Sequence, residues 1–131
     1  MRLDILDVAR ARLEEAGLRE VRATSQVDAR RTPESVSVFM GAPAESVGFY
    51  DMEWVTTIRL TVVCRRLSEA DAMADAGEAH DALRRGDLSS ENGSYELLGV
   101  EVSEPRPVLW DESGRTVWCV EANVEIKRED F

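Results

Sequence analysis

The chain has 131 residues, of which 44% are hydrophobic and 32% charged, and its formal net charge is −10. This composition is that of an ordinary globular protein, and we expect residues 1–131 to form a single domain with its own core. No apolar run approaches the ~20 residues that cross a membrane, and acidic residues within the first seventeen positions exclude a secretory signal core. We therefore expect no membrane partner and synthesis in a cytoplasm.

The charge is unevenly distributed along the chain. Residues 1–33 hold seven arginines and six acids, whereas residues 34–131 hold nine basic and twenty acidic residues. An acidic body repels phosphate backbones, so sequence-specific nucleic-acid binding is disfavoured. Two interpretations remain: the asymmetry serves solubility, or the arginine-rich beginning of one copy meets the acidic body of the next.

The first element is an amphipathic helix. Apolar residues recur at spacings of three and four, which predicts one buried stripe. The stripe consists of Leu3, Leu6, Ala9, Leu13 and Ala16. Gly17 is expected to end the helix in the left-handed conformation, with Leu18 touching Leu13 in a Schellman-type closure.

The segment after this helix is polar and rich in arginine, with a short strand expected near Val21 to Ala23. Arg30 and Arg31 stand just before Thr32-Pro33, which indicates an exposed connection. If the chain assembles with itself, these two arginines are expected to contact acidic residues of a neighbouring subunit. Residues 35–40 then alternate as a strand, and the loop expected over residues 41–48 turns the chain into a hairpin.

Residues 50–64 predict one long strand, around which the other elements are arranged. Every second residue from Tyr50 to Cys64 is apolar or small enough to form a buried face. Fifteen residues at roughly 3.3 Å each span about 50 Å, so this strand must bend, bulge or project beyond its own domain. The aromatic residues Phe39, Phe49 and Tyr50 flank the preceding loop and form either a second subunit contact or core beneath the loop.

A second helix is predicted between residues 68 and 86, beginning with a capping-box-like Ser68-Glu69-Ala70-Asp71 and ending at Gly86. Its expected buried stripe consists of Ala72, Met73, Ala76, Ala79, His80 and Leu83. Such small side chains allow a helix to lie close to a sheet. On this stripe His80 is interpreted as a packed or edge residue rather than a ligand.

The last third of the sequence predicts strands and turns. Leu98, Val100 and Val102 alternate within residues 95–103, and Pro105-Arg106-Pro107 places the following stretch at a sheet edge or corner. Residues 116–127 return as a long strand whose buried face consists of Trp118, Val120, Ala122, Val124 and Ile126. The fold class is therefore α+β: two helices packed on a mainly antiparallel sheet of four to five strands, in the order α-β-β-α-β-β, with one long hairpin.

No residue pattern in the chain indicates a reaction. The sequence has no glycine-rich phosphate loop, no nucleophile elbow and no Cys-x-x-Cys, and it contains one histidine. Cys64 and Cys119 are interpreted as buried free thiols. We expect no catalytic residue, no cofactor and no metal, and we expect the protein not to be an enzyme. A small enzyme with a pocket beneath the second helix near His80 is the weakest hypothesis.

The arrangement of elements resembles a known family. A first helix, a hairpin with one overlong strand, a second helix and a closing hairpin are similar to the tail terminator proteins and the related minor capsid (head–tail connector) proteins of long-tailed bacteriophages. The clearest local likeness runs from Pro105-Arg106-Pro107 through Leu109-Trp110-Asp111-Glu112-Ser113-Gly114-Arg115 to Trp118 and the strand ending at Lys127.

The resemblance implies a virion structural protein, assembled in the host cytoplasm, that forms a ring, typically a hexamer. Such a ring caps the tail tube and joins it to the head, so its partners are other copies of the chain, the tail tube protein and the head–tail connector proteins. DNA would pass through the ring lumen without specific binding. The alternative is an acidic immunity or antitoxin-like protein that binds a basic enzyme.

Overall fold

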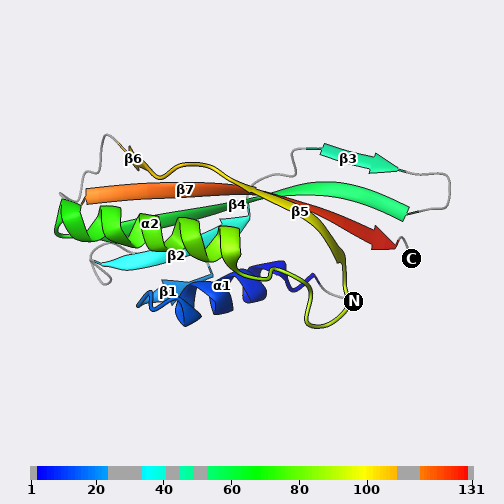
Figure 1. Ribbon diagram of the computed structural model, residues 1–131, viewed down its shortest axis with the longest axis horizontal. Helices are drawn as coiled ribbons and strands as arrows, with labels where there is room; N and C mark the ends of the chain where they lie inside the picture. The colour runs from blue at the N-terminus through cyan, green and yellow to red at the C-terminus, as the bar shows by residue number, and fades with distance from the viewer. Residues whose placement is uncertain (1–2, 24–33, 41–44, 49–52, 109–115, 130–131) are drawn as a thin grey trace.

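The computed structural model describes residues 3–23, 34–40, 45–48, 53–108 and 116–129. Within these residues the chain forms two helices and seven strands, which together make a layer of helix against a layer of sheet (Figure 1). In chain order the elements are α1 (Ile5–Glu15), β1 (Val21–Arg22), β2 (Ser35–Met40), β3 (Glu45–Gly48), β4 (Glu53–Arg66), α2 (Glu69–Arg85), β5 (Glu96–Val102), β6 (Arg106–Val108) and β7 (Thr116–Glu129).

The seven strands occupy five rows of one sheet. The main order is β1-β2-β4-β7-β5. Strand β7 pairs with β4 along all fourteen residues of each strand, so β2 and β3 must share the opposite edge of β4, one after the other. By the same argument β5 and β6 share the outer edge of β7. The expected four to five strands therefore agree with the five rows of the sheet, but the sheet contains seven separate strands, more than expected.

The long strand and the closing strand, each predicted as a strand from its alternation, lie side by side at the centre of the sheet. All pairings are antiparallel except that of β1 with β2. Both helices cover the same face, which is lined by side chains that are at most 5% exposed. From β2, β4 and β7 these are Val36, Val38, Ile58, Leu60, Val62, Cys64, Val120, Ala122, Val124 and Ile126. Burial of this apolar surface is the main driving force for folding.

The loop expected over residues 41–48 is partly wrong, because Glu45–Gly48 form strand β3. This strand pairs with residues 54–57 of β4, beyond the part of β4 that β2 reaches. A strand as long as β4 leaves backbone donors and acceptors unpaired where β2 ends, and β3 satisfies them. Further along the chain, β6 lies on an outer row of the sheet, as its prolines required.

Helix α1 ends in the predicted Schellman motif. Gly17 has φ +97°, its N–H donates to Glu14 O at 3.0 Å, and the N–H of Leu18 donates to Leu13 O at 3.3 Å. The buried stripe is rotated from the expected one, however: Ala16 is exposed, while Ile5 and Val8 are buried. The helix packs toward α2 as well as the sheet, which widens the apolar face beyond a single stripe.

Helix α2 begins and ends at the predicted residues. Ser68 Oγ accepts the N–H of Asp71, and the helix stops at Gly86. Gly86 has an extended backbone, with φ −70° and ψ 153°, so a left-handed conformation is not the reason for a glycine here. The reason is steric, because a Cβ at this position would clash with the backbone oxygen of Ala82. The expected burial of Met73 is wrong, since its side chain is 51% exposed at the rim of the buried stripe.

A β-bulge in β5 overturns the expected face of Leu98. The pairing with β7 shifts by one residue between Leu97 and Gly99. The shift directs Leu97 toward the core together with Val100 and Val102 and leaves Leu98 45% exposed. An alternation of two cannot reveal an inserted residue, which is why the sequence pattern misassigned Leu98.

Two polar clusters tie distant parts of the chain together. At one end, the carboxylate of Asp4, just before α1, accepts hydrogen bonds from Ser90 Oγ at 2.8 Å and Ser94 Oγ at 3.2 Å. It also accepts the backbone N–H groups of Glu91 and Asn92 at 2.9 and 3.1 Å. Burial alone would raise the pKa of Asp4, but these hydrogen bonds outweigh it and hold the pKa below its usual value.

The second cluster is centred on Arg66, at the end of β4. Its guanidinium donates to Asp75 of α2, to Glu20 and to the carbonyl of Arg19. Burial alone would lower the pKa of Arg66, but the hydrogen bonds and charges of Asp75 and Glu20 raise it. The side chain is only 6% exposed, so this ion pair joins helix, sheet and the segment after α1 where water has little access.

Candidate assembly interface

The face of the sheet opposite the helices is not covered by a helix of the described chain. It carries the alternate residues of the central strands, which are Val55, Thr57, Arg59, Thr61, Val63 and Arg65 of β4 and Cys119, Glu121, Asn123 and Glu125 of β7. Most of these side chains are half-buried or exposed. Valine and threonine between charged residues give a flat, mixed surface. This side of the sheet is called the outer face below.

One end of the sheet extends past both helices. Figure 1 shows β3 and the adjoining ends of β4 and β7 reaching beyond α1 and α2 on the right-hand side. Among the described elements, β3 packs substantially against β4 alone. The overlong strand predicted from the sequence therefore does project, as part of a β3–β4–β7 arm that extends past both helices.

The two lateral edges of the sheet carry opposite charge. The edge at β1 presents Arg19 and Arg22, whereas the edge at β5 presents Glu96, Glu101 and Glu104. All five side chains are exposed, and among the described residues none of them forms an ion pair, in contrast to the pairs Arg10–Glu14, Arg12–Glu15 and Arg106–Glu121. The charges at the edges are thus available to a partner.

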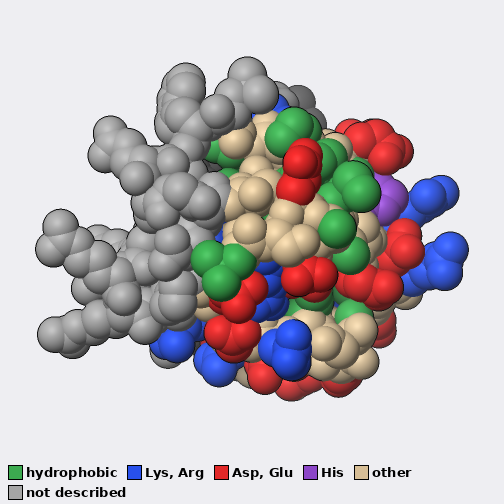
Figure 2. Space-filling view, turned by 90° about the vertical axis from the view of Figure 1, so that its left-hand side faces the viewer, with side chains coloured by type: hydrophobic (Ala, Val, Ile, Leu, Met, Phe, Trp, Pro, Cys, Tyr) green, Lys and Arg blue, Asp and Glu red, His purple; other side chains and the backbone are tan. Residues whose placement is uncertain are grey.

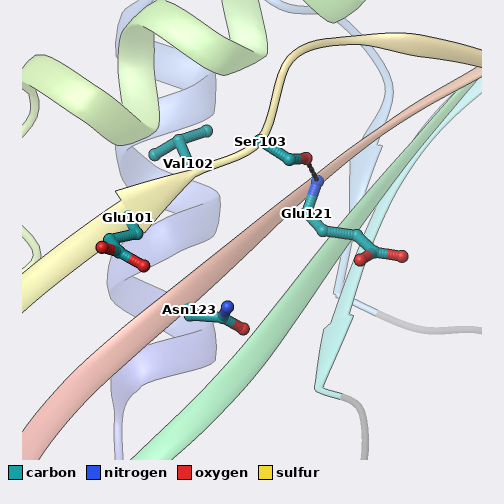
Figure 3. A pocket seen from close by; sticks show the side chains of 5 residues that line it. All are labelled: Glu101, Val102, Ser103, Glu121 and Asn123. Atoms are coloured by element: carbon teal, nitrogen blue, oxygen red, sulfur yellow. Dashed lines mark hydrogen bonds between the residues drawn. The ribbon is translucent and has the colours of Figure 1, made fainter.

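A shallow hollow of about 430 Å³ lies on the outer face beside the acidic edge. Figure 3 shows Glu101 on β5 and Glu121 and Asn123 on β7 around it, with Ser103 at one end. Ser103 Oγ accepts the N–H of Glu121 at 3.0 Å and fixes the rim. The two carboxylates make the hollow a place for a cationic side chain.

The end of the molecule where α2 begins has a different surface. Figure 2 looks at this end and shows hydrophobic side chains in small groups among acidic and basic ones. Leu67 and Met73 are the large apolar residues exposed there, at 64% and 51%. Scattered apolar residues of this kind are normal on a protein surface.

The subunit contacts expected from the sequence are only partly located. Phe39 lies on β2 opposite Thr61 and is half-buried. Arg30, Arg31, Phe49 and Tyr50 lie outside the described residues. The structure therefore neither joins these five residues into one surface nor separates them.

The two cysteines and the histidine are packed within the fold. Cys64 and Cys119 are free and buried, as predicted. Burial, reinforced by the nearby Asp75 charge, raises the pKa of Cys64 to about 12. His80 is a packed residue at the edge of the α2 stripe, with its ring 12% exposed. Over the described ranges no cluster of three metal-ligating side chains occurs, and no helix has the length and apolar character to span a membrane.

Comparison with known proteins identifies the family. The model of a family described as bacteriophage tail terminator protein matches residues 14–128, most of the chain. The chain belongs to the bacteriophage tail terminator protein family. It is therefore a phage tail component and a virion structural protein, as the resemblance implied.

A solved structure shares the fold of this tail terminator family member. The matching chain comes from a structure described as the virion of a native gene transfer agent (GTA) particle. The TM-score is 0.63, the identity is 14%, and the match covers 93% of each chain. A search among curated proteins found no match.

Sequence reasoning missed the edges of the sheet. The charge asymmetry between residues 1–33 and the rest of the chain was visible, but strand order was not, so nothing indicated that β1 and β5 lie on opposite sides. The signal lies in the exposed charges themselves, because Arg19, Arg22 and Glu101 fall on the solvent side of their segments.

Proposed function

We propose that the chain is a ring-forming subunit that caps the tail tube and joins it to the head. The observation that carries the proposal is the β3–β4–β7 arm, which extends past both helices (Figure 1). Membership of the tail terminator family gives the context in which such an arm would act. The ring is six-fold in the form that the resemblance implies.

A subunit with unlike ends supports a ring rather than a symmetric dimer. Contacts between different surfaces of identical copies close into a ring when the rotation between neighbours allows it. The acidic body suits a ring through which DNA passes, because negative walls do not retain the phosphate backbone. The proposed role is non-catalytic and requires no cofactor. Its other partners are the tail tube protein and the head–tail connector proteins.

The residues proposed for the subunit contact are Arg30, Arg31, Phe39, Phe49 and Tyr50. Arg30 and Arg31 are proposed to meet acidic residues of the adjacent copy. The three aromatic residues stand in the sequence next to the β3–β4–β7 arm, and we propose that they add apolar area to the contact. Of the five, Phe39 is the one within the described residues, on β2 beside the arm.

The test is assembly of the purified protein, measured by light scattering coupled to size exclusion and by negative-stain electron microscopy. We expect closed rings, either at rising protein concentration or on purified tail tubes. Arg30→Glu combined with Arg31→Glu is expected to abolish rings while the melting temperature stays nearly unchanged. A protein that remains monomeric up to millimolar concentration and does not bind tube ends would contradict the proposed function.

A further inference from the structure

We infer that neighbouring copies in the ring meet edge to edge, with the β1 edge of one copy against the β5 edge of the next. This inference rests on the proposed ring and names the surfaces that close it. The basic edge consists of Arg19 and Arg22, and the acidic edge consists of Glu96, Glu101 and Glu104. The occupant of each edge is thus a second copy of this chain.

The sheet order places the two edges on opposite sides of the subunit. Strand β1 is the first row and β5 the last, with β2, β4 and β7 between them. Side chains at the two ends of one sheet cannot reach each other within a subunit. In a row of copies, however, the last strand of one copy stands beside the first strand of the next, which is the relation that a head-to-tail ring requires.

The two charged edges lie on opposite sides of the subunit, but Arg22 and Glu101 point to the same face of the sheet. Arg22 pairs in register with Ser37, which lies opposite Val63 on the face away from the helices. Glu101 is opposite Asn123 on that same outer face. When the sheets of two copies stand edge to edge in the same orientation, the guanidinium and the carboxylate therefore point to the same side, without any backbone pairing between the copies.

The hollow beside the acidic edge is the binding site that we assign to an arginine of the adjacent copy. Glu101 and Glu121 flank it, and Asn123 lies between them (Figure 3). Glu121 already receives Arg106 at 2.7 Å, whereas Glu101 has no ion-pair partner among the described residues. Arg22 of the adjacent copy is the side chain that we assign to this hollow, bound mainly by Glu101.

The charges at the edges also disfavour a symmetric dimer in which two like edges meet. Two β1 edges brought together would oppose arginines, and two β5 edges would oppose glutamates, so like charges disfavour symmetric pairs. Extension of the backbone ladder is limited as well, because β1 has two residues and the β6 row carries Pro105 and Pro107 nearby. The contact is therefore made by side chains.

Charge reversal tests the pairing. Arg19→Glu/Arg22→Glu makes both edges acidic, and Glu96→Arg/Glu101→Arg makes both edges basic. Each variant alone is expected to need at least about tenfold more protein for half-assembly in low salt, because every contact in its ring opposes like charges. Mixed in equal amounts, the two variants are expected to assemble again in alternation, and the fourfold variant is expected to assemble by itself.

The controls separate this inference from the proposed function. Arg84→Glu/Arg85→Glu makes the same change in net charge at the end of α2 and is expected to leave half-assembly unchanged. Thermal unfolding of every variant checks that the fold is intact. If the wild type forms rings and the edge variants do so equally well, or if mixing and the fourfold variant restore nothing, the edge pairing is wrong and the ring remains. If the wild type never assembles, even on tail tubes, both are wrong.

Discussion

Nε of Arg66 lies 2.5 Å from Oδ2 of Asp75, which joins the end of β4 to the first half of α2. The same guanidinium holds Glu20 at 2.9 Å, so three segments meet at one buried cation. Removing one member of a buried pair leaves the other charge without compensation, which costs about 3–5 kcal/mol in comparable proteins.

We expect Arg66→Ala to lower the free energy of unfolding by about 3 kcal/mol, measured by urea denaturation at neutral pH. Glu20→Gln is expected to have a much smaller effect, because the Glu20 side chain is 46% exposed and keeps its contact with water. Arg59→Ala, at an exposed position on the same strand, is the control. A loss for Arg66→Ala no greater than that of Arg59→Ala would show that the cluster does not stabilise the fold.

The Asp4 cluster predicts a dependence of stability on pH. Since folding holds the pKa of Asp4 below its usual value, its contribution is fully present above the unfolded carboxyl pKa of about 4. The contribution is lost as the pH falls through the lower folded value. We expect Asp4→Asn to cost about 1–2 kcal/mol at pH 7.

The check is the difference in melting temperature between wild type and Asp4→Asn over a series of pH values. This difference is expected to shrink steadily below pH 4. Asp7→Asn, in the exposed first turn of α1, is the matched control. A difference that is constant down to pH 2 would mean that the charge of Asp4 contributes nothing through its hydrogen bonds to residues 90–94.

Gly77 inside α2 and Gly86, which follows its last residue, predict opposite effects of the same substitution. A Cβ on Gly77 meets nothing within 4 Å, whereas a Cβ on Gly86 strikes the carbonyl oxygen of Ala82. Because glycine inside a helix costs about 1 kcal/mol relative to alanine, Gly77→Ala is expected to raise the free energy of unfolding by nearly that amount. Gly86→Ala is expected to lower it. Chemical denaturation of the two single variants decides, and equal effects would contradict the steric argument.

The buried thiols predict inertness in the folded state. Burial raises the pKa of Cys64 to about 12, so the reactive thiolate is absent at pH 8, and Cys119 is 5% exposed. We expect the native protein to react negligibly with a thiol reagent at pH 8 within minutes. The denatured protein is expected to react with two equivalents of the reagent per chain, one for each cysteine. Fast reaction of the native protein would place at least one thiol at the surface.

The fold followed from the sequence wherever one pattern controlled one element. The alternation from Ile58 to Cys64 and from Trp118 to Ile126 predicted the two central strands, and Gly17 predicted the end of α1. The pattern was insufficient where pairing determines structure. The bulge beside Leu98, the strand β3 and the parallel pair β1–β2 each depend on which backbone groups remain unpaired in the assembled sheet.

The candidate assembly interface was less predictable for the same reason. The overlong strand indicated an arm, and the arm is present in β3, β4 and β7. The edges are defined by strand order, which no local property of Arg22 or Glu101 reports. Charge asymmetry along the chain indicated that unlike ends exist, but not that they lie at opposite sides of one sheet.

The position of β7 has a consequence for synthesis. This strand comes after all the other described elements in the chain, yet it lies between β4 and β5 in the sheet. Until residues 116–129 have left the ribosome, β5 has no strand to pair with. The apolar side of α2 can then pack against β4 but not against β7. A nascent chain therefore cannot complete the sheet before β7 is available, and the β5 row is the last part of the sheet to form.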